Sequence, residues 1–283
     1  MDKLDAPVST FLDQILSDVA DELSSTKARR PAHEVRTMLG DAPPPRDFHG
    51  ALASGFGLIA EIKERSPSVG PMRAQNVADA PAAYEESPIV RAISVLTNSL
   101  HFGMSIERLA AVRAQVSRPV LRKDFILDEY QVREARAFGA DAILLMANVL
   151  DAPRLAGFYD LARELGMEAL FEVHVEEEIA LLPPGARVVG INSRKFKSAS
   201  GFVGATGSSS KDFTLAFDAF DIVEKLPSDA LRIAESGLSP ANLALARERF
   251  HAALIGTSLL RDEAGIRACL GQFEAALAVP QAE

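Results

Sequence analysis

The chain has 283 residues, 48% of them hydrophobic and 24% charged, a balance that suits one large globular domain with a sizeable core. Its formal net charge of −9 disfavours nucleic acid and anionic membranes as partners, because both attract basic surfaces. The single cysteine, Cys269, excludes an intrachain disulfide. We find no membrane-spanning stretch, secretory signal or zinc-site spacing, so we expect a cytoplasmic protein without a bound metal.

The first predicted element is an amphipathic helix over residues 9–30, which Ser9 or Thr10 can cap. A proline-rich segment at 41–48 follows, and a helix cannot run through it. We therefore expect residues 1–48 to form an N-terminal helical extension to a barrel over 49–283, all within one domain. The apolar side chains that share one face of the helix are Phe11, Leu12, Ile15, Leu16, Val19 and Leu23.

Eight short apolar runs then alternate with longer helical stretches. Most runs are about 20 to 30 residues apart, the length of a strand plus a returning helix. They are apolar throughout, as expected when helices cover one face of the strands and a core fills the other. The eight runs are Leu58–Ile62, Val90–Leu96, Pro119–Leu121, Ala142–Met146, Ala169–Val173, Arg187–Ile191, Leu231–Ala234 and Ala252–Ile255.

The stretches between the runs have helical periodicity, and Gly139 and Gly166 stand where two of them should end. Eight strand–helix units in series predict an α/β fold, the (β/α)8 TIM barrel, with an extra N-terminal helix. One connection, the Ser/Gly-rich segment 197–213, is longer than the others; it is either a loop on the active-site rim or an insertion without a role. The clearest predicted helices are Ser105–Val116, Tyr130–Phe138, Pro153–Leu165 and Pro240–Phe250.

Polar side chains gather at or just after the ends of the runs. Barrel active sites lie at the carboxyl ends of the strands, so residues far apart in sequence are expected to meet on one rim. Charged side chains beside apolar runs are costly unless they are paired, and therefore indicate a function. In chain order these residues are Glu61, Lys63, Lys123, Glu172, Asn192, Arg194, Glu235, Ser236, Gly256, Thr257 and Ser258.

The last two units also predict a phosphate site. Small residues follow both the seventh and eighth runs, in ESGL at 235–238 and IGTSLL at 255–260. Loops after strands seven and eight of barrels often hold a phosphate through backbone N–H groups. Gly237 and Gly256 let the backbone approach such a ligand closely, and SPSVG at 66–70 could add a hydroxyl from the first loop.

Several motifs resemble the indole-3-glycerol phosphate synthase family over nearly the whole chain. The matching segments are AEIKERSPSVG (60–70), PVLRKDFILDEYQVREARAFGADAILL (119–145), FEVH (171–174), GINSR (190–194), AESGL (234–238) and LIGTSLLR (254–261). The resemblance implies a carbon–carbon lyase of tryptophan biosynthesis that uses no cofactor or metal. It implies ring closure, decarboxylation and dehydration of 1-(2-carboxyphenylamino)-1-deoxyribulose 5-phosphate.

The resemblance also implies residue roles. Lys123 would be the general acid on the substrate carbonyl, and Glu172 would move protons during dehydration. Lys63 would lie near the substrate carboxylate and the leaving oxygen, and Glu61 near the bridging amine, while Asn192 and Ser236 would orient the sugar hydroxyls. The implied phosphate residues are Ser66, Gly237, Gly256 and Thr257. The implied ring and rim residues are Phe102, Phe125, Leu144 and Arg194, of which we expect Arg194 to brace the rim. We expect His174 and Glu235 to support the site, and Cys269 to be a packed thiol.

Some rim positions depart from the family pattern. Glu64 and Lys195–Phe196 are unusual for the family, as is the segment TNSLHFGMS at 97–105. These departures leave open a paralogue acting on a substituted anthranilate-derived substrate, and a non-catalytic barrel that binds a phosphorylated ligand. A related isomerase barrel needs a strand-end cysteine, and Cys269 lies in the last helix instead. We expect a small phosphorylated substrate and a monomer or weak homo-oligomer.

Overall fold

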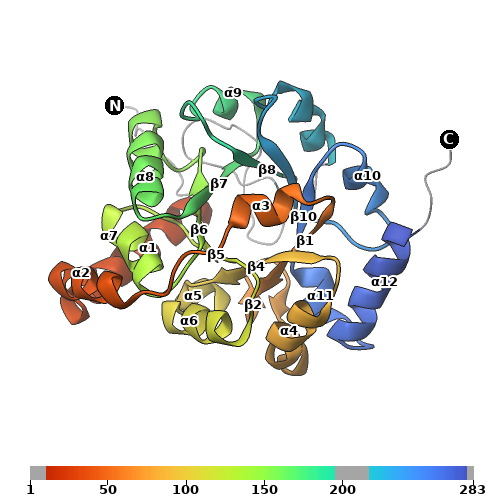
Figure 1. Ribbon diagram of the computed structural model, residues 1–283, viewed down its shortest axis with the longest axis horizontal. Coiled ribbons are helices and arrows are strands. Elements are labelled where there is room, and N and C mark those ends of the chain that lie inside the picture. Colours follow the sequence, from red (N-terminus) through yellow and green to blue (C-terminus); the bar gives the residue numbers. More distant parts are fainter. Residues whose placement is uncertain (1–10, 195–216, 279–283) are drawn as a thin grey trace, which may run out of the picture.

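The computed structural model describes residues 11–194 and 217–278, and its centre is a closed barrel of eight parallel strands (Figure 1). Pairing of Gly57 with Ala252 joins the first and last strands and closes the barrel. The predicted TIM-barrel fold is therefore confirmed. The strands, in barrel order, are β1 (Gly57–Ile62), β10 (Ala252–Ile255), β9 (Leu231–Glu235), β8 (Val188–Asn192), β7 (Glu168–Val173), β6 (Ala142–Met146), β5 (Val120–Lys123) and β4 (Val90–Leu96).

Alternation of side chains along the strands divides the core into two clusters. Leu144 of β6 belongs to the cluster inside the barrel, whereas its neighbours Ile143 and Leu145 belong to the cluster between strands and helices. Successive side chains of a strand point to opposite faces, so an apolar run supplies both clusters at once. This is why the strands read as unbroken hydrophobic runs in the sequence.

Helices cover the outside of the barrel, and several begin at side-chain caps. Ser105, Asp128 and Asp151 each accept a hydrogen bond from a backbone N–H in the first turn of the helix that follows. The helices after β1 are α4 (Ala74–Glu86), α5 (Ser99–Phe102), α6 (Ile106–Gln115), α7 (Glu129–Ala137), α8 (Ala152–Glu164), α9 (Glu176–Ile179), the 3-10 helix η1 (Phe217–Lys225), α10 (Ala244–Arg247), α11 (Thr257–Arg261) and α12 (Ile266–Ala278).

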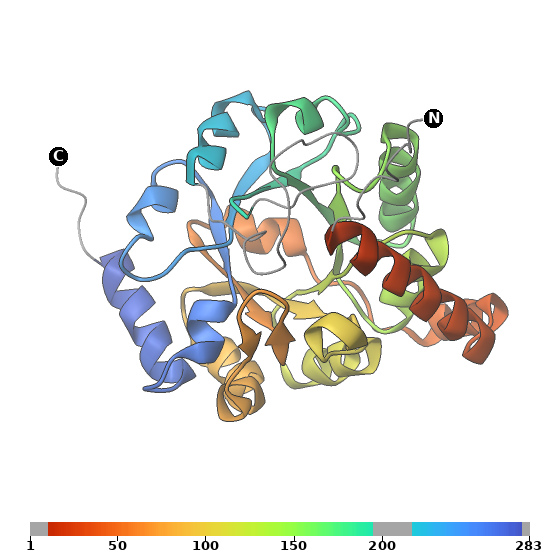
Figure 2. The same cartoon turned by 180° about the vertical axis from the view of Figure 1, so that it is seen from behind.

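The N-terminal extension contributes to both ends of the barrel. Helix α1 (Phe11–Arg29) lies at the end seen in Figure 2, and α3 (Phe48–Ala53) lies at the opposite end, seen in Figure 1. Buried residues of both helices belong to the cluster inside the barrel. The barrel interior is thus closed at both ends by segments that precede its first strand.

Several elements differ from the sequence predictions. The helix predicted over 9–30 is present from Phe11, but α2 (Ala32–Asp41) and the short hairpin β2 (Arg65–Ser66) and β3 (Gly70–Pro71) were not predicted. The helix predicted over Pro240–Phe250 shrinks to α10, because the Asn242 side chain accepts bonds from the Ser239 N–H and hydroxyl and holds a turn there. The segment 197–213 lies outside the described residues.

A buried carboxylate, Asp141, ties the extension to the barrel. Its Oδ1 accepts from the backbone N–H of Arg46 at 2.8 Å and from the Arg113 guanidinium at 3.0 Å, and its Oδ2 accepts from the Val120 N–H at 2.8 Å. The Asp141 side chain has no exposed surface. The Asp141 carboxylate therefore links the N-terminal extension, β5 and α6 through hydrogen bonds.

We predict that Asp141→Asn lowers the free energy of unfolding by about 3 kcal/mol or more, because an amide nitrogen would face backbone donors and Arg113 would lose its buried partner. Urea unfolding followed by circular dichroism measures this. Asp160→Asn, at an exposed position of α8, is the matched control. Equal stability of the two variants would contradict the prediction.

Candidate active site

A cavity of about 320 Å³ opens at the carboxyl ends of the strands, and each of the eight strands contributes to it. Most of the residues singled out in the sequence line it, so the structure brings together positions up to about two hundred residues apart. The predicted residues that line the cavity are Glu61, Lys63, Phe102, Lys123, Phe125, Leu144, Glu172, Asn192, Arg194, Glu235, Ser236, Gly237, Gly256, Thr257 and Ser258.

The centre of the cavity is a buried ammonium between two carboxylates. Lys123 Nζ at the end of β5 lies 2.8 Å from Glu172 Oε2 of β7 and 3.3 Å from Glu235 Oε2 of β9. Both carboxylate side chains are only 1% exposed. Asp124, the next residue in the chain, pairs with Arg122 at 3.0 Å, so Lys123 and Asp124 do not form the surface ion pair that an isolated Lys–Asp dipeptide would favour.

Burial and mutual charge drive the two carboxylates to different protonation states. Burial raises the pKa of Glu235 to about 8; the Lys123 ammonium opposes this rise and the Glu172 carboxylate adds to it. Burial acts in the same direction on Glu172, but Lys123 and His174 outweigh it and hold the pKa of Glu172 well below its usual range. Burial alone would lower the pKa of Lys123, but the surrounding carboxylates raise it above its ordinary value. At neutral pH the cluster therefore contains a cation, an anion and a neutral acid.

A second ion pair lies at the end of β1. Lys63 Nζ is 2.6 Å from Glu61 Oε1, and both side chains are less than a tenth exposed. The phenol of Tyr84, buried in α4, donates to the Glu61 carbonyl at 3.0 Å and holds the end of the strand. The cavity thus contains two lysines, each held by at least one carboxylate from a strand end.

Two glycines make room for these carboxylates. A β-carbon at Gly190 of β8 would lie 2.0 Å from Glu235 Oε1, and one at Gly256 would lie 2.4 Å from Glu61 Oε1. Real β-carbons do not approach other atoms so closely, so a side chain at either position would displace the carboxylate of the neighbouring strand. Gly256 was predicted for phosphate contact; it also accommodates Glu61.

The turn after β9 has an unusual backbone. Ser236 has a φ of 71°, a left-handed value that costs energy in a residue with a side chain, and Gly237 follows with 73°. Ser193 Oγ donates to the Ser236 carbonyl at 3.1 Å and stabilises the turn. Strained backbone of this kind concentrates at functional sites, where the surrounding structure maintains it.

Ser66 is the predicted phosphate residue that does not line the cavity. Its hydroxyl lies 3.0 Å from the Ser68 hydroxyl, to which Arg194 Nη1 also donates at 3.1 Å. Arg194 therefore links the loop after β8 to the loop after β1, as expected for a residue that braces the rim. The backbone N–H of Arg194 donates to Asn192 Oδ1 at 3.0 Å, which fixes the amide at the end of β8.

The remaining wall is apolar. Phe125 and Leu144 are buried, and Phe102 is partly buried; a flat aromatic group would fit against these side chains. Glu64, the charge reversal noted in the sequence, does not line the cavity; its half-exposed side chain lies 3.9 Å from Arg108. Lys195 and Phe196 lie outside the described residues.

Sequence reasoning assigned Glu235 a supporting role, whereas the structure places it in the cavity lining and against Lys123. The signal in the sequence was its position directly after the seventh apolar run. His174 does support the site, with Nε2 at 3.5 Å from Glu172 Oε1. Cys269 is packed in α12, 2% exposed, as predicted. Within the described residues, no group of three or more His, Cys, Asp and Glu side chains could hold a metal ion, and no helix could span a membrane.

The closed barrel and the lysine–carboxylate cluster at its strand ends define an enzyme of the (β/α)8-barrel class built for acid–base catalysis. The family model of indole-3-glycerol phosphate synthase matches residues 12–268. Relatives named indole-3-glycerol phosphate synthase include one from Mycobacterium ulcerans, 39% identical over 260 residues, and one from Saccharopolyspora erythraea, 40% identical over 264 residues. These alignments cover 90% of this chain and 90% and 91% of the relatives.

The chain belongs to the indole-3-glycerol phosphate synthase family, a family of decarboxylating lyases. Among solved structures, 3-hexulose-6-phosphate synthase from Salmonella typhimurium aligns with a TM-score of 0.56 over 78% of this chain and 98% of that chain. At 13% identity this similarity concerns the fold alone. The relatives do not favour the two alternatives left open by the sequence, a paralogue with a substituted substrate and a non-catalytic barrel.

We predict that Gly190→Ala leaves the fold intact but lowers kcat/KM at least about tenfold, because the new methyl group displaces the flexible end of Glu235 from Lys123. Steady-state kinetics and a thermal melt measure the two effects. Gly271→Ala, in α12 with open space around the position, is the control and should keep full activity. Full activity of Gly190→Ala would contradict the assigned position of the carboxylate.

Proposed function

We propose that the chain converts 1-(2-carboxyphenylamino)-1-deoxyribulose 5-phosphate into indole-3-glycerol phosphate, releasing carbon dioxide and water. The observation that carries this proposal is the Lys123 ammonium, which lies between Glu172 and Glu235 in a cavity with an apolar wall and a glycine-containing rim. Ring closure, decarboxylation and dehydration together require a fixed proton donor, a base and a means of bending the substrate. The cavity offers side chains for each.

Two ends of the cavity suit two ends of the substrate. The phosphate would bind Gly237, Gly256 and Thr257, with Ser66 outside the cavity lining, while the anthranilate ring would lie against the wall that contains Phe102, Phe125 and Leu144. Holding both ends brings the aryl carbon and the ketone carbon together. Such positioning contributes on the order of 7 kcal/mol to lowering the barrier.

The first step forms a carbon–carbon bond. The aryl carbon that carries the carboxylate attacks the ketone, and Lys123 donates a proton to the carbonyl oxygen as it gains negative charge. Carbon dioxide then leaves, and the electrons of the broken bond restore the aromatic ring. Lys63 would bind the carboxylate, with Glu61 holding Lys63 and facing the bridging amine. Asn192 and Ser236 would orient the sugar hydroxyls.

Dehydration completes the indole. The hydroxyl formed in the first step leaves as water after protonation by a lysine, and Glu172 accepts the proton that is lost from the new ring. The depressed pKa of Glu172 keeps it ionised, which is the form in which a carboxylate can accept a proton. Glu235, protonated near neutral pH, adds no negative charge to a cavity that must take a carboxylate and a phosphate.

We predict that Lys123→Ala reduces kcat at least about a thousandfold, because the ketone oxygen loses its proton donor. The assay adds the carboxyphenylamino-deoxyribulose phosphate and follows indole fluorescence. Lys225→Ala, which changes an exposed lysine on η1, is the control and should retain wild-type turnover. Turnover retained by Lys123→Ala in a folded protein would remove Lys123 from the mechanism, and a wild-type protein without turnover would refute the proposed function.

The pKa of Glu235 predicts a fall of kcat/KM as the pH rises through about 8. Below that pH Glu235 is neutral; above it the carboxyl ionises, and the new charge repels the anionic substrate and competes for Lys123. A pH–rate profile measures the fall. Glu235→Gln cannot ionise, so its profile should lack this alkaline fall even though its rate is lower. An alkaline fall near pH 8 that persists in Glu235→Gln would assign the titration to another group.

We also propose that the protein works in the cytoplasm as one domain without a cofactor, as a monomer or weak homo-oligomer. The single cysteine and the acidic net charge support this proposal. Light scattering of the purified protein gives the oligomeric state directly.

A further inference from the structure

The part of the cavity wall that carries Phe102 packs only lightly on the core, through the partly buried Phe102 side chain. Phe102 ends α5, a helix of four residues that contains no buried residue, and Leu100 on it is 57% exposed. A single helical turn is not stable by itself. Contacts from other elements must therefore hold α5 where Phe102 can face the substrate.

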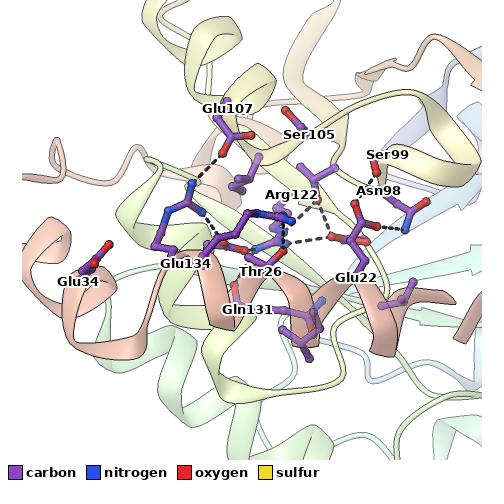
Figure 3. Close-up of a pocket in the computed structure, with 17 residues that line it drawn as sticks. Glu22, Thr26, Glu34, Asn98, Ser99, Ser105, Glu107, Arg122, Gln131 and Glu134 are labelled. Carbon is purple, nitrogen blue, oxygen red and sulfur yellow. Dashed lines mark hydrogen bonds and ion pairs between the residues drawn. The ribbon is translucent and has the colours of Figure 1, made fainter. Parts of the chain in front are cut away.

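Helix α1 supplies such contacts through two carboxylates. Glu22 Oε2 accepts from Asn98 Nδ2 at 2.9 Å and Glu22 Oε1 accepts from Ser99 Oγ at 2.5 Å, as Figure 3 shows. One turn earlier on the same face of α1, Asp18 Oδ2 lies 2.9 Å from His101 Nε2. The three partners are consecutive or nearly consecutive residues around α5.

The position of α1 is itself well determined. Leu12, Ile15 and Val19, on the neighbouring face of α1, are buried in the cluster inside the barrel, which also contains Phe125 and Leu144 of the apolar wall. The carboxylates therefore extend from a fixed support. They reach α5 beside a cavity of about 400 Å³ between α1 and the barrel, and an edge-to-face contact between the rings of Phe11 and His101, with centroids 6.3 Å apart, adds to these polar contacts.

Asn98 connects the carboxylate to the conformation of α5. Its Oδ1 caps the helix by accepting from the His101 N–H at 2.8 Å, while its Nδ2 donates to Glu22. At the other end of α5, the Phe102 carbonyl accepts from the Glu64 N–H at 3.0 Å. A shift of Asn98 away from α1 would thus move the start of the turn relative to its end, and with it Phe102.

We propose that Glu22 and Asp18 are positioning residues that fix the Phe102 wall and so set the affinity for the aromatic end of the substrate. The proposal rests on the proposed function, because it assigns the aromatic ring to that wall. It makes the N-terminal helix part of the substrate site although neither carboxylate is among the residues that line the catalytic cavity.

The test uses Asn98→Asp in the full chain. An aspartate caps a helix as well as asparagine does, so α5 keeps its cap, but the introduced carboxylate faces Glu22 and repels it. We expect KM for the substrate to rise about fivefold while kcat stays within about twofold, since the loss is one of ground-state positioning. Adding Glu22→Gln should restore KM, because the amide can donate to the introduced carboxylate.

Two controls separate positioning from general damage. Asp21→Asn removes an exposed charge from the same helix and should leave KM unchanged. The inhibition constant of inorganic phosphate, which would report the opposite end of the cavity, should be the same in all variants. A wild-type KM in Asn98→Asp, no restoration in the double variant, or an equal rise in the phosphate constant would each overturn the proposal.

Hydrogen exchange gives a readout that does not depend on turnover. Amide exchange across residues 98–103 should be faster in Asn98→Asp and return toward the wild-type rate in the double variant. If the wild-type protein showed no turnover, the proposed function would be refuted, but hydrogen exchange would still test whether Glu22 and Asp18 hold α5 in position. Should Asn98→Asp not fold, Asp18→Asn, which leaves α5 unaltered, is expected to raise exchange in the same residues; unchanged exchange there would overturn the proposal.

Discussion

The active site depends on one ammonium group held in a buried position by carboxylates from two other strands. An isolated lysine at the end of β5 would lose its charge on burial, because a low-dielectric surrounding disfavours the ionised form. The ionised Glu172, 2.8 Å from the ammonium, reverses that preference, and Glu61 adds to its effect. Burial and the mutual proximity of these groups separate the two carboxyl pKa values, so one environment contains an ionised carboxylate, a neutral carboxylic acid and an ammonium.

That arrangement is possible only because the barrel is closed. Lys123, Glu172 and Glu235 come from β5, β7 and β9, and their Cα atoms are set by the parallel register of the strands between them. Each strand is buried on both faces, so its end cannot move without disturbing the core. The rigid part of the fold therefore places these three charged side chains, and the loops and the N-terminal extension shape the cavity around them.

The barrel and most of the cavity could be predicted from the sequence because both depend on local patterns. Buried strands appear as apolar runs, and residues that follow a run must lie on the rim once the sheet closes. Glu235 was placed correctly at a strand end, but its contact with Lys123 and its raised pKa were not predicted, since both depend on residues that are distant in the chain. The α2 helix was not predicted because only one of its residues is buried, which leaves no apolar periodicity in the sequence. The contacts between α1 and α5 were not predicted because they join Glu22 to Asn98 and Ser99, which are distant in the chain. The placement of Ser66 beside Ser68 depends on a hairpin whose strands have two residues each. Strands this short show no alternation of apolar and polar residues in the sequence.

The two glycines beside the carboxylates have a consequence for how such a barrel can be altered. The carboxylate of Glu235 on β9 occupies the space that a β-carbon at Gly190 on β8 would fill. The residue at position 190 and the conformation of Glu235 therefore depend on each other. If β9 alone were transferred into a barrel that has alanine in place of Gly190, Glu235 would be present but its carboxylate could not adopt the position that it has here. Strands β8 and β9 would have to be exchanged together, because the glycine that faces Glu235 determines where its carboxylate lies.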